Sequence, residues 1–236
     1  MVIYIDIGNT NIKINFNKYY VSYPTKQKYS VDSFYNALPK ELKGRITKVF
    51  ISSVAPSVLD LINGVSKKYW GVLPNNIAYP MKTGIKINAD QPKKVGADLV
   101  CLAAFATTKG SNCIIVNMGT ATTITHVVDH AFMGCVILPG FMTSLYSLFK
   151  SAAAIGETAL YVPTNKKIGH STEESISIGM IRGHVHMING LVNDIDPNAK
   201  LILSGGNSKN IAKYLTNFKY VKEATIEGMK IIVKDM

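Results

Sequence analysis

The sequence predicts an α/β protein built from two duplicated domains. Segments with strand-like alternation and β-branched residues are interspersed with segments of helical periodicity, as a layered α/β fold requires. A strand–turn–strand–turn–strand pattern near residue 1 returns about 110 residues later, whereas repeat arrays have periods of roughly 20–50 residues. This spacing indicates duplication of a whole domain. We place the boundary near residue 111, which gives domains over 1–111 and 112–236.

The first domain is expected to begin with three strands joined by turns rich in Asn, Gly and Lys. A helix, a strand and a second helix follow, and Pro56 suits the first turn of that second helix. An irregular, lid-like segment rich in Pro, Asn and Lys then leads to a third helix. The three strands are expected over 2–6, 12–16 and 19–23, the first helix over 31–39, the next strand over 49–54 and the second helix over 56–69. The irregular segment is expected over 74–94 and the third helix over 95–109.

The second domain repeats the three strands and continues with a helix that opens at Pro139-Gly140. A loop, a long helix, a strand, a short helix and a terminal helix complete it. Ser171 or Thr172 is suited to cap the long helix, whose first turn carries two favourable glutamates. The three strands are expected over 112–118, 123–128 and 132–138. The loop is expected over 155–170, the long helix over 172–192, the next strand over 201–206 and the terminal helix over 223–233.

The composition argues against several classes of protein. The chain has 26 Lys+Arg against 15 Asp+Glu, a net charge of +11, but only Arg45 and Arg182 are arginines. Because sequence-reading interfaces depend on bidentate guanidinium groups, this lysine coat makes nucleic acid an unlikely partner. The longest wholly apolar run, 99–106, is far below the roughly 18 residues of a membrane span. We therefore expect a soluble cytoplasmic protein.

Neither cysteine nor histidine spacing indicates a metal site or a disulfide. Cys101, Cys113 and Cys135 form no CxxC pair and lie in apolar segments, as small buried side chains of a reducing compartment do. His184 and His186 are two apart on an expected helix, which points them to different sides. The chain also lacks the Gly-Lys dipeptide of a P-loop, so any nucleotide chemistry needs another architecture.

Three glycine-containing turns carry the candidate chemistry. Asp6 to Thr10 joins a carboxylate at a strand end to a Gly and small polar residues, which suits Mg²⁺ and phosphate oxygens, although an ordinary hairpin turn explains it equally well. Asn117 to Thr123 has the same form in the second repeat. Leu203 to Ser208 ends a strand and is expected to open a helix. Its glycines would let the backbone approach a base or ribose, and the helix N-terminus would offer free N–H groups.

The order of these turns resembles the phosphate-1, phosphate-2 and adenosine segments of the actin, sugar kinase and Hsp70 superfamily. More closely, the chain is similar to type III pantothenate kinases over nearly its whole length. The motifs that carry this resemblance are DIGNTNIK at 6–13, GAD at 96–98, GTATT at 119–123, MGCVILPG at 133–140, STEESISIG at 171–179 and SGG at 204–206. Their combination and spacing are specific, although no single motif is.

The resemblance implies duplicated ribonuclease H-like (actin-like ATPase) domains with an interdomain nucleotide cleft. It also implies ATP-dependent phosphorylation of pantothenate to phosphopantothenate, the first step of coenzyme A biosynthesis, by a homodimer. Asp98 is the implied general base for the pantothenate hydroxyl. The implied ATP contacts are Asp6, Ile7, Gly8, Asn9, Thr10, Asn11, Ile12, Lys13, Thr120, Gly205 and Gly206. The implied pantothenate contacts are Gly96, Ala97, Asp98, Leu99 and Thr172.

Two kinds of ion follow from the same resemblance. Mg²⁺ is expected on the ATP phosphates near Asp6, and a monovalent cation, K⁺ or NH₄⁺, near Asn117. At four positions the chain departs from the family pattern: Leu99 replaces an Arg, Ala89 a Tyr, and Asn117 and Thr125 each an Asp. Neighbouring lysines, Lys93 and Lys94, are better explained as a solvated loop than as substitutes for the Arg.

The departures leave alternatives open. A catalytically weakened or inactive homologue could act as a nucleotide-binding or transcription-regulatory protein, and an active enzyme lacking the aromatic wall at Ala89 could take another acceptor. From sequence alone, Asp98 is better explained as a carboxylate that the helix dipole stabilises at a helix start than as a base.

Overall fold

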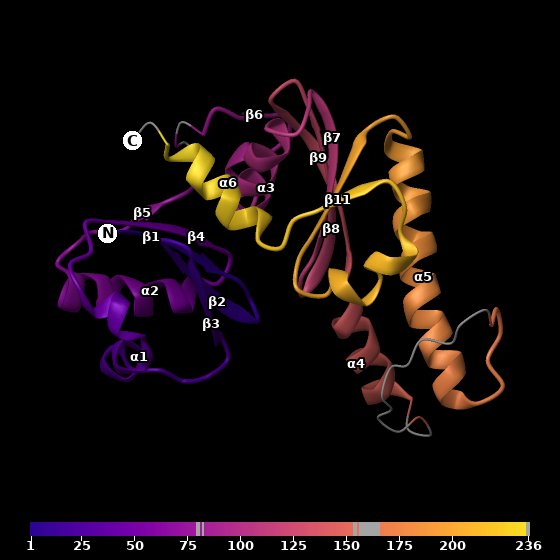
Figure 1. The fold of residues 1–236 in the computed structure, drawn as a ribbon, viewed down its shortest axis with the longest axis horizontal. Helices are drawn as coiled ribbons and strands as arrows, with labels where there is room; N and C mark the ends of the chain where they lie inside the picture. The colour runs from indigo at the N-terminus through magenta and orange to yellow at the C-terminus, as the bar shows by residue number, and fades with distance from the viewer. Residues whose placement is uncertain (79–80, 82, 153–154, 156–165, 235–236) are drawn as a thin grey trace. The chain divides into compact units, whose positions relative to one another are not determined.

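The computed structural model describes residues 1–78, 81, 83–152, 155 and 166–234, and Figure 1 shows its ribbon. The chain forms two compact units. The first contains Met1–Thr108, His130–Phe132 and the C-terminal segment that begins at Ala224, and the second contains Lys109–Asp129 and Met133–Glu223. The C-terminal helix therefore belongs to the first unit. Our division into domains over 1–111 and 112–236 stays a prediction.

The first unit is built on a five-stranded sheet with the order β3-β2-β1-β4-β5. β1 is antiparallel to β2 and parallel to β4, as a hairpin followed by a helical crossover produces. The strands are β1 (Val2–Ile7), β2 (Asn11–Phe16), β3 (Tyr19–Pro24), β4 (Lys48–Ser53) and β5 (Asn75–Asn76). The helices are α1 (Val31–Ala37), α2 (Pro56–Val65), α3 (Ala97–Thr107) and α6 (Ala224–Ile232).

The alternation of side chains along β1 separates two cores. Ile3, Ile5 and Ile7 are fully buried in a cluster that includes residues of α1 and α2. Val2 and Tyr4 point the other way and pack in a cluster with residues of α3 and α6. Because successive strand residues face opposite sides, Asp6 lies on the α3/α6 face of the sheet.

Two features fix α6 in the first unit. Gly228 lies directly against the Cys101 backbone of α3, where an added Cβ would be 2.5 Å from the carbonyl carbon. At the surface, Glu227 accepts a hydrogen bond from the Tyr20 hydroxyl at 2.7 Å and pairs with Lys230 at 2.8 Å. The helix that ends the chain thus completes the layer that covers the face bearing Asp6.

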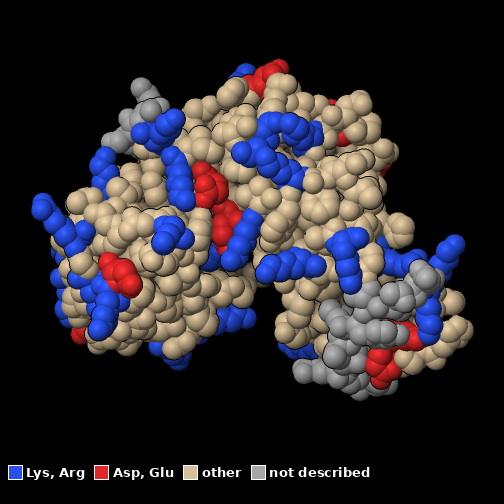
Figure 2. All heavy atoms as spheres, viewed as in Figure 1, with Lys and Arg blue, Asp and Glu red and all other residues tan. Residues whose placement is uncertain are grey.

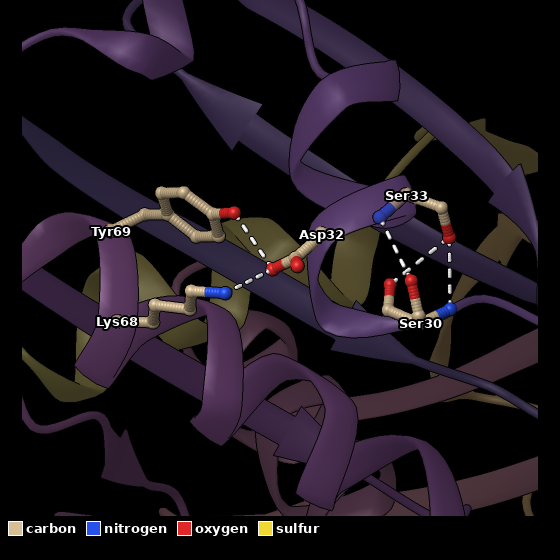
Figure 3. A network of polar contacts seen from close by, with 5 residues as sticks. All are labelled: Ser30, Asp32, Ser33, Lys68 and Tyr69. Atoms are coloured by element: carbon tan, nitrogen blue, oxygen red, sulfur yellow. Dashed lines mark hydrogen bonds and ion pairs between the residues drawn. The ribbon is translucent and has the colours of Figure 1, made fainter.

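A polar network joins α1 to the turn that follows α2 (Figure 3). Ser30 caps α1 by accepting from the Ser33 N–H, and the Ser33 hydroxyl accepts from the Ser30 N–H, which completes a capping box. Asp32 accepts hydrogen bonds from Lys68 and Tyr69, and the Lys68 bond is the main reason that its pKa is lowered. The network lies at the surface, and we assign it a structural role.

The second unit has a sheet with the order β11-β10-β7-β8-β9. The short β6 (Lys86–Ile87) belongs to the first unit and pairs with Ala131 and Phe132, the two residues at the start of β9 that belong to the same unit. α4 (Phe141–Ser151) and α5 (Thr172–Ile195) share a core with Ile114, Val116 and Met118 on one face of this sheet. The strands are β7 (Asn112–Met118), β8 (Ala121–Val128), β9 (Ala131–Pro139), β10 (Lys200–Ser204) and β11 (Phe218–Tyr220).

Apart from the segment after β10, the predicted helices and strands are confirmed in type and order within the described ranges, and the short strands β5, β6 and β11 were not predicted. The helix expected over 56–69 has its α-helical part over Pro56–Val65 and continues as a π-helical turn over Ser66–Trp70, which Gly71 ends at φ 64°. The helix expected after Leu203 to Ser208 was wrong in kind, because two three-residue 3₁₀ turns follow β10. Most of the loop expected over 155–170 lies outside the described residues.

The surface in Figure 2 agrees with a solvated lysine coat: basic side chains are dispersed over the visible face, and acidic ones lie among them. Among the helices of the described ranges, none is long and apolar enough to span a bilayer. Cys101 and Cys113 are buried and Cys135 is half-buried, and none of these three forms a disulfide.

Candidate functional site

The turn after β1 presents its polar residues to solvent. Gly8 donates its N–H to the Asn11 carbonyl at 3.0 Å, and Asn9, Thr10 and Asn11 are exposed. Thr25 donates hydrogen bonds to two carbonyls of this turn. Its N–H donates to Thr10 O at 2.9 Å, and its hydroxyl donates to Gly8 O at 2.8 Å. The turn is therefore held from one side while its polar side chains stay accessible.

The other members of the predicted ATP-binding segment differ in what they can offer. Ile7 and Ile12 are fully buried in the core, so only their backbone could face a ligand. Lys13 lies opposite Asp6 in the register of β1 and β2, on the same face of the sheet. The predicted segment thus places one carboxylate and one cation side by side at the end of β1.

Asp6 fits a magnesium ion that arrives with phosphates better than a resident metal. Across the part of the chain that the structure describes, no three or more His, Cys, Asp or Glu side chains form a group able to hold a metal. Mg²⁺ is commonly held by one or two carboxylates together with substrate phosphates, and it keeps several waters. A single strand-end carboxylate beside exposed polar residues meets that requirement.

Asp98 is a half-buried carboxylate in the first turn of α3. Its Oδ1 accepts a hydrogen bond from the Leu99 N–H at 2.9 Å, and a Cβ on Gly96 would lie 2.5 Å from the same atom. Glycine at 96 therefore lets the carboxylate lie against the backbone. Burial raises the pKa of Asp98 above the ordinary Asp value, and the Leu99 hydrogen bond only partly opposes this.

Cys101 packs on the same face of the first sheet as Asp6 and lies one turn of α3 after Asp98, on the same face of that helix. Burial raises the pKa of its thiol far above the usual range, the Asp6 charge adds to this, the Ser52 hydroxyl opposes it, and the Asp98 charge adds a smaller effect. Ser52 is also the register partner of Asp6 on β4. The α3/α6 face of the first sheet thus carries the buried Ser52 and Cys101 together with the half-buried Asp6 and Asp98.

In the second unit, the turn Gly119–Thr120 is braced from two other segments. Thr120 O accepts from the Gly140 N–H at 3.1 Å and from the Thr143 hydroxyl at 2.7 Å. Gly119 O accepts from the Asn207 side-chain amide at 3.0 Å. The turn that repeats the form of Asp6 to Thr10 is thus fixed by the start of α4 and by the segment after β10.

The glycine pair after β10 has a steric requirement at its first member. Gly205 has φ +94°, and a Cβ there would lie 2.5 Å from both Met118 N and Met118 O. Only glycine tolerates this conformation and this approach. Gly206 is exposed, with open space around it. The pair therefore lies against the end of β7, next to the Gly119–Thr120 turn.

The position predicted for a monovalent cation offers only neutral oxygens. Asn117 is the register partner of Thr123 and Ser204, and Thr125 follows on the same face of the sheet. The Thr123 and Thr125 hydroxyls are buried and have no hydrogen-bond partner among the described residues. These oxygens could coordinate a cation, but none of the four side chains carries a charge to attract it.

Thr172 and the remaining predicted residues lie in different settings. Thr172 is exposed at the first position of α5, after Ser171 caps the helix by accepting from Glu174 N at 3.2 Å. It belongs to the second unit, whereas Gly96, Ala97 and Asp98 belong to the first. Leu99 is buried at 8% exposure, so this position forms part of the packed interior.

The flanking positions of the predicted pantothenate segment are exposed. Ala89, Lys93 and Lys94 all face solvent, which agrees with a solvated loop for the two lysines. Sequence reasoning did not identify Ser52, Cys101 or Thr143 as parts of the site, because strand register and helix packing bring these residues in. Asn207 lies within the predicted segment Leu203 to Ser208, but no role of its own was predicted for it.

Comparisons with known proteins agree with this arrangement of segments. A family model described as type III pantothenate kinase matches residues 2–194. A type III pantothenate kinase of Mycoplasma mobile is 31% identical over 237 residues, covering 98% of this chain and 97% of that protein. One of Dictyoglomus turgidum is 32% identical over 243 residues, covering 96% and 94%.

Solved structures show the fold. A Baf family transcriptional activator from Campylobacter jejuni aligns with TM-score 0.66 and 22% identity, covering 99% of this chain and 98% of that one. The (R)-2-hydroxyglutaryl-CoA dehydratase component A from Acidaminococcus fermentans aligns with TM-score 0.54 and 13% identity, covering 98% and 95%. The predicted α/β class is therefore confirmed, and these structures share the fold of this chain.

Proposed function

Because the chain belongs to the type III pantothenate kinase family, we propose that it transfers the γ-phosphoryl group of ATP to the primary hydroxyl of pantothenate. The product, phosphopantothenate, would enter coenzyme A biosynthesis. The observation in this molecule that best supports the proposal is that Asp98 lies in the first turn of α3, one helical turn before Cys101, and that Cys101 packs against the face of the first sheet that carries Asp6. This arrangement joins the carboxylate suited to nucleotide phosphates with the carboxylate suited to proton uptake.

Phosphoryl transfer needs alignment and charge stabilisation more than covalent help from the protein. In the proposed reaction the pantothenate hydroxyl oxygen bonds to the γ-phosphorus while the bond to the bridging oxygen of ADP breaks. Asp98 takes up the hydroxyl proton, and its raised pKa makes it a stronger base than an ordinary Asp. Lys13, beside Asp6, supplies positive charge for the phosphate oxygens.

The ions and contacts form the finer part of the proposal. Mg²⁺, when bound with ATP, would neutralise phosphate charge beside Asp6, which would act as its protein ligand. Pantothenate would contact Gly96, Ala97, Leu99 and Thr172. A monovalent cation at Asn117 would depend on neutral oxygens alone, so we expect weak binding there. We also propose a homodimer located in the cytoplasm.

The direct test combines purified protein with ATP, Mg²⁺ and pantothenate, with and without K⁺, and identifies the product by mass spectrometry. We expect phosphopantothenate and ADP in equal amounts, and little product from Asp98→Asn. Parallel reactions with other primary alcohols test the acceptor. Absence of product at high enzyme concentration, with ATP still bound, would favour a nucleotide-binding homologue without kinase activity.

A further inference from the structure

The Gly119–Thr120 turn has an unusual distribution of hydrogen bonds on its carbonyl oxygens. Gly119 O accepts from the Asn207 amide, and Thr120 O accepts from two donors, the Gly140 N–H and the Thr143 hydroxyl. Backbone carbonyls carry negative partial charge and would repel phosphate oxygens if they faced a nucleotide. Here both carbonyls of the turn are directed toward donors of the protein itself.

Asn207 connects two segments with predicted ATP contacts. Its side-chain amide donates to Gly119 O at 3.0 Å, and its backbone N–H donates to Met118 O at 3.0 Å. It directly follows the Gly205–Gly206 pair, whose first glycine lies against Met118. One residue therefore fixes the position of the glycine pair relative to the turn, through two hydrogen bonds of normal length.

Thr143 holds the turn from the other side. It is the third residue of α4, it is exposed, and its hydroxyl donates to Thr120 O at 2.7 Å. The same carbonyl accepts from Gly140, the N-cap of α4. Because the hydroxyl lies at the surface and outside the core, its removal should move the turn without unfolding the second unit.

We propose that Asn207 and Thr143 are positioning residues for ATP, which act by directing the carbonyls of the Gly119–Thr120 turn away from the nucleotide and fixing that turn to the Gly205–Gly206 pair. The proposal rests on the proposed function, since the resemblance supplies the ATP role of these two segments. All the residues that carry it belong to the second unit.

The inference predicts selective effects on the nucleotide. A hydrogen bond of this kind contributes roughly 0.5–1.5 kcal/mol, which corresponds to about a 2- to 12-fold change in an equilibrium constant. Thr143→Val, which replaces the hydroxyl by a methyl group, should raise the KM for ATP and the Kd of a non-hydrolysable ATP analogue by about this factor. Thr143→Ser should restore both values, because it keeps the donor.

Asn207→Asp should have the larger effect. The substitution keeps the shape but replaces the amide donor with a charged acceptor that faces Gly119 O and lies near the predicted phosphate site. Asn207→Ala removes the donor without adding charge and should give the smaller increase. Asn210→Ala, at an exposed position of the same 3₁₀ turn, is the matched control and should bind the analogue as the unmodified protein does.

The experiment measures analogue binding by calorimetry without pantothenate, then KM values for ATP and pantothenate, kcat and the melting temperature. The expected result is a higher ATP KM and analogue Kd, with the pantothenate KM changed less than twofold. Equal changes in both KM values, failure of Thr143→Ser to restore binding, or unchanged analogue binding in Thr143→Val and Asn207→Ala would overturn the inference. Because binding is measured without an acceptor, an unmodified protein that binds ATP but forms no product contradicts the proposed function alone.

Discussion

Asp98→Asn should separate the catalytic role of this carboxylate from its effect on stability. The amide preserves the shape of the side chain and the oxygen that accepts from Leu99 N–H, but it cannot take up the hydroxyl proton. A positioned general base contributes roughly 10²–10⁴-fold to the rate. We therefore expect kcat/KM to fall by about this factor, or about 2.7–5.4 kcal/mol of transition-state stabilisation at about 1.36 kcal/mol per tenfold.

The same substitution should not reduce stability at neutral pH. Burial raises the pKa of folded Asp98 above the ordinary value of 3.8, so the folded protein binds this proton more tightly than the unfolded chain does. The contribution of this proton to the free energy of unfolding is fully present below the ordinary pKa and is lost as the pH rises through the pKa of the folded protein. At pH 7 the ionised carboxylate therefore lowers the free energy of unfolding, and Asn removes that cost.

Urea unfolding at roughly pH 5 and roughly pH 8, together with steady-state kinetics, tests both parts. The stability of Asp98→Asn relative to the unmodified protein should increase with pH, while its activity stays low. Asp60→Asn, an exposed position on α2, serves as the control and should change neither quantity. An Asn variant that is less stable at both pH values, or one with activity within threefold of the original, would refute the reasoning.

Three further predictions concern packing and the helix cap. Gly228→Ala should destabilise the protein by about 1–3 kcal/mol, because its Cβ would press on the Cys101 carbonyl group. Gly183→Ala, where the added Cβ meets open space, is the control and should not destabilise it. Equal melting temperatures of the two variants would contradict this prediction. Ser30→Ala should cost about 0.5–2 kcal/mol in urea unfolding through loss of the α1 cap, and a smaller loss would mean that the cap is dispensable. The half-buried thiol of Cys135 should react with a thiol reagent before the fully buried Cys101, and the reverse order would show that α3 opens.

The fold was predictable because its signals are local. The isoleucines of β1 and β2 alternate with polar residues, and Pro56 and Ser171 mark helix starts that the structure confirms. The placement of α6 could not be predicted, because the contact of Gly228 with Cys101 joins residues far apart in the chain. The segment after Leu203 was expected to open a helix, but Gly205 has a positive φ where it lies against Met118, and two short 3₁₀ turns follow it.

The site residues that lie in one contiguous motif were predictable from the sequence. Those that come together only in the fold, from segments far apart in the chain, were not. DIGNT and GTATT place polar residues at strand ends, and the structure has both at the ends of β1 and β7. Ser52 joins Asp6 only through strand register, and Thr143 joins Thr120 only because α4 begins beside the turn. A single sequence carries no signal for either contact. The neutral Leu99 could be recognised as a departure, but its burial could not.

The structure bears on the two interpretations of Asp98 that the sequence left open. A carboxylate that mainly stabilises a helix start would be solvated, would accept from N–H groups two or three residues ahead, and would have a lowered pKa. Asp98 instead is half-buried, accepts from its immediate neighbour Leu99, and has a pKa that burial raises. Gly96, the N-cap of α3, makes no side-chain capping bond and is glycine where a Cβ would strike the carboxylate. A desolvated carboxylate that weakens the fold at neutral pH is better explained by proton transfer than by helix capping, and this supports Asp98 as the base.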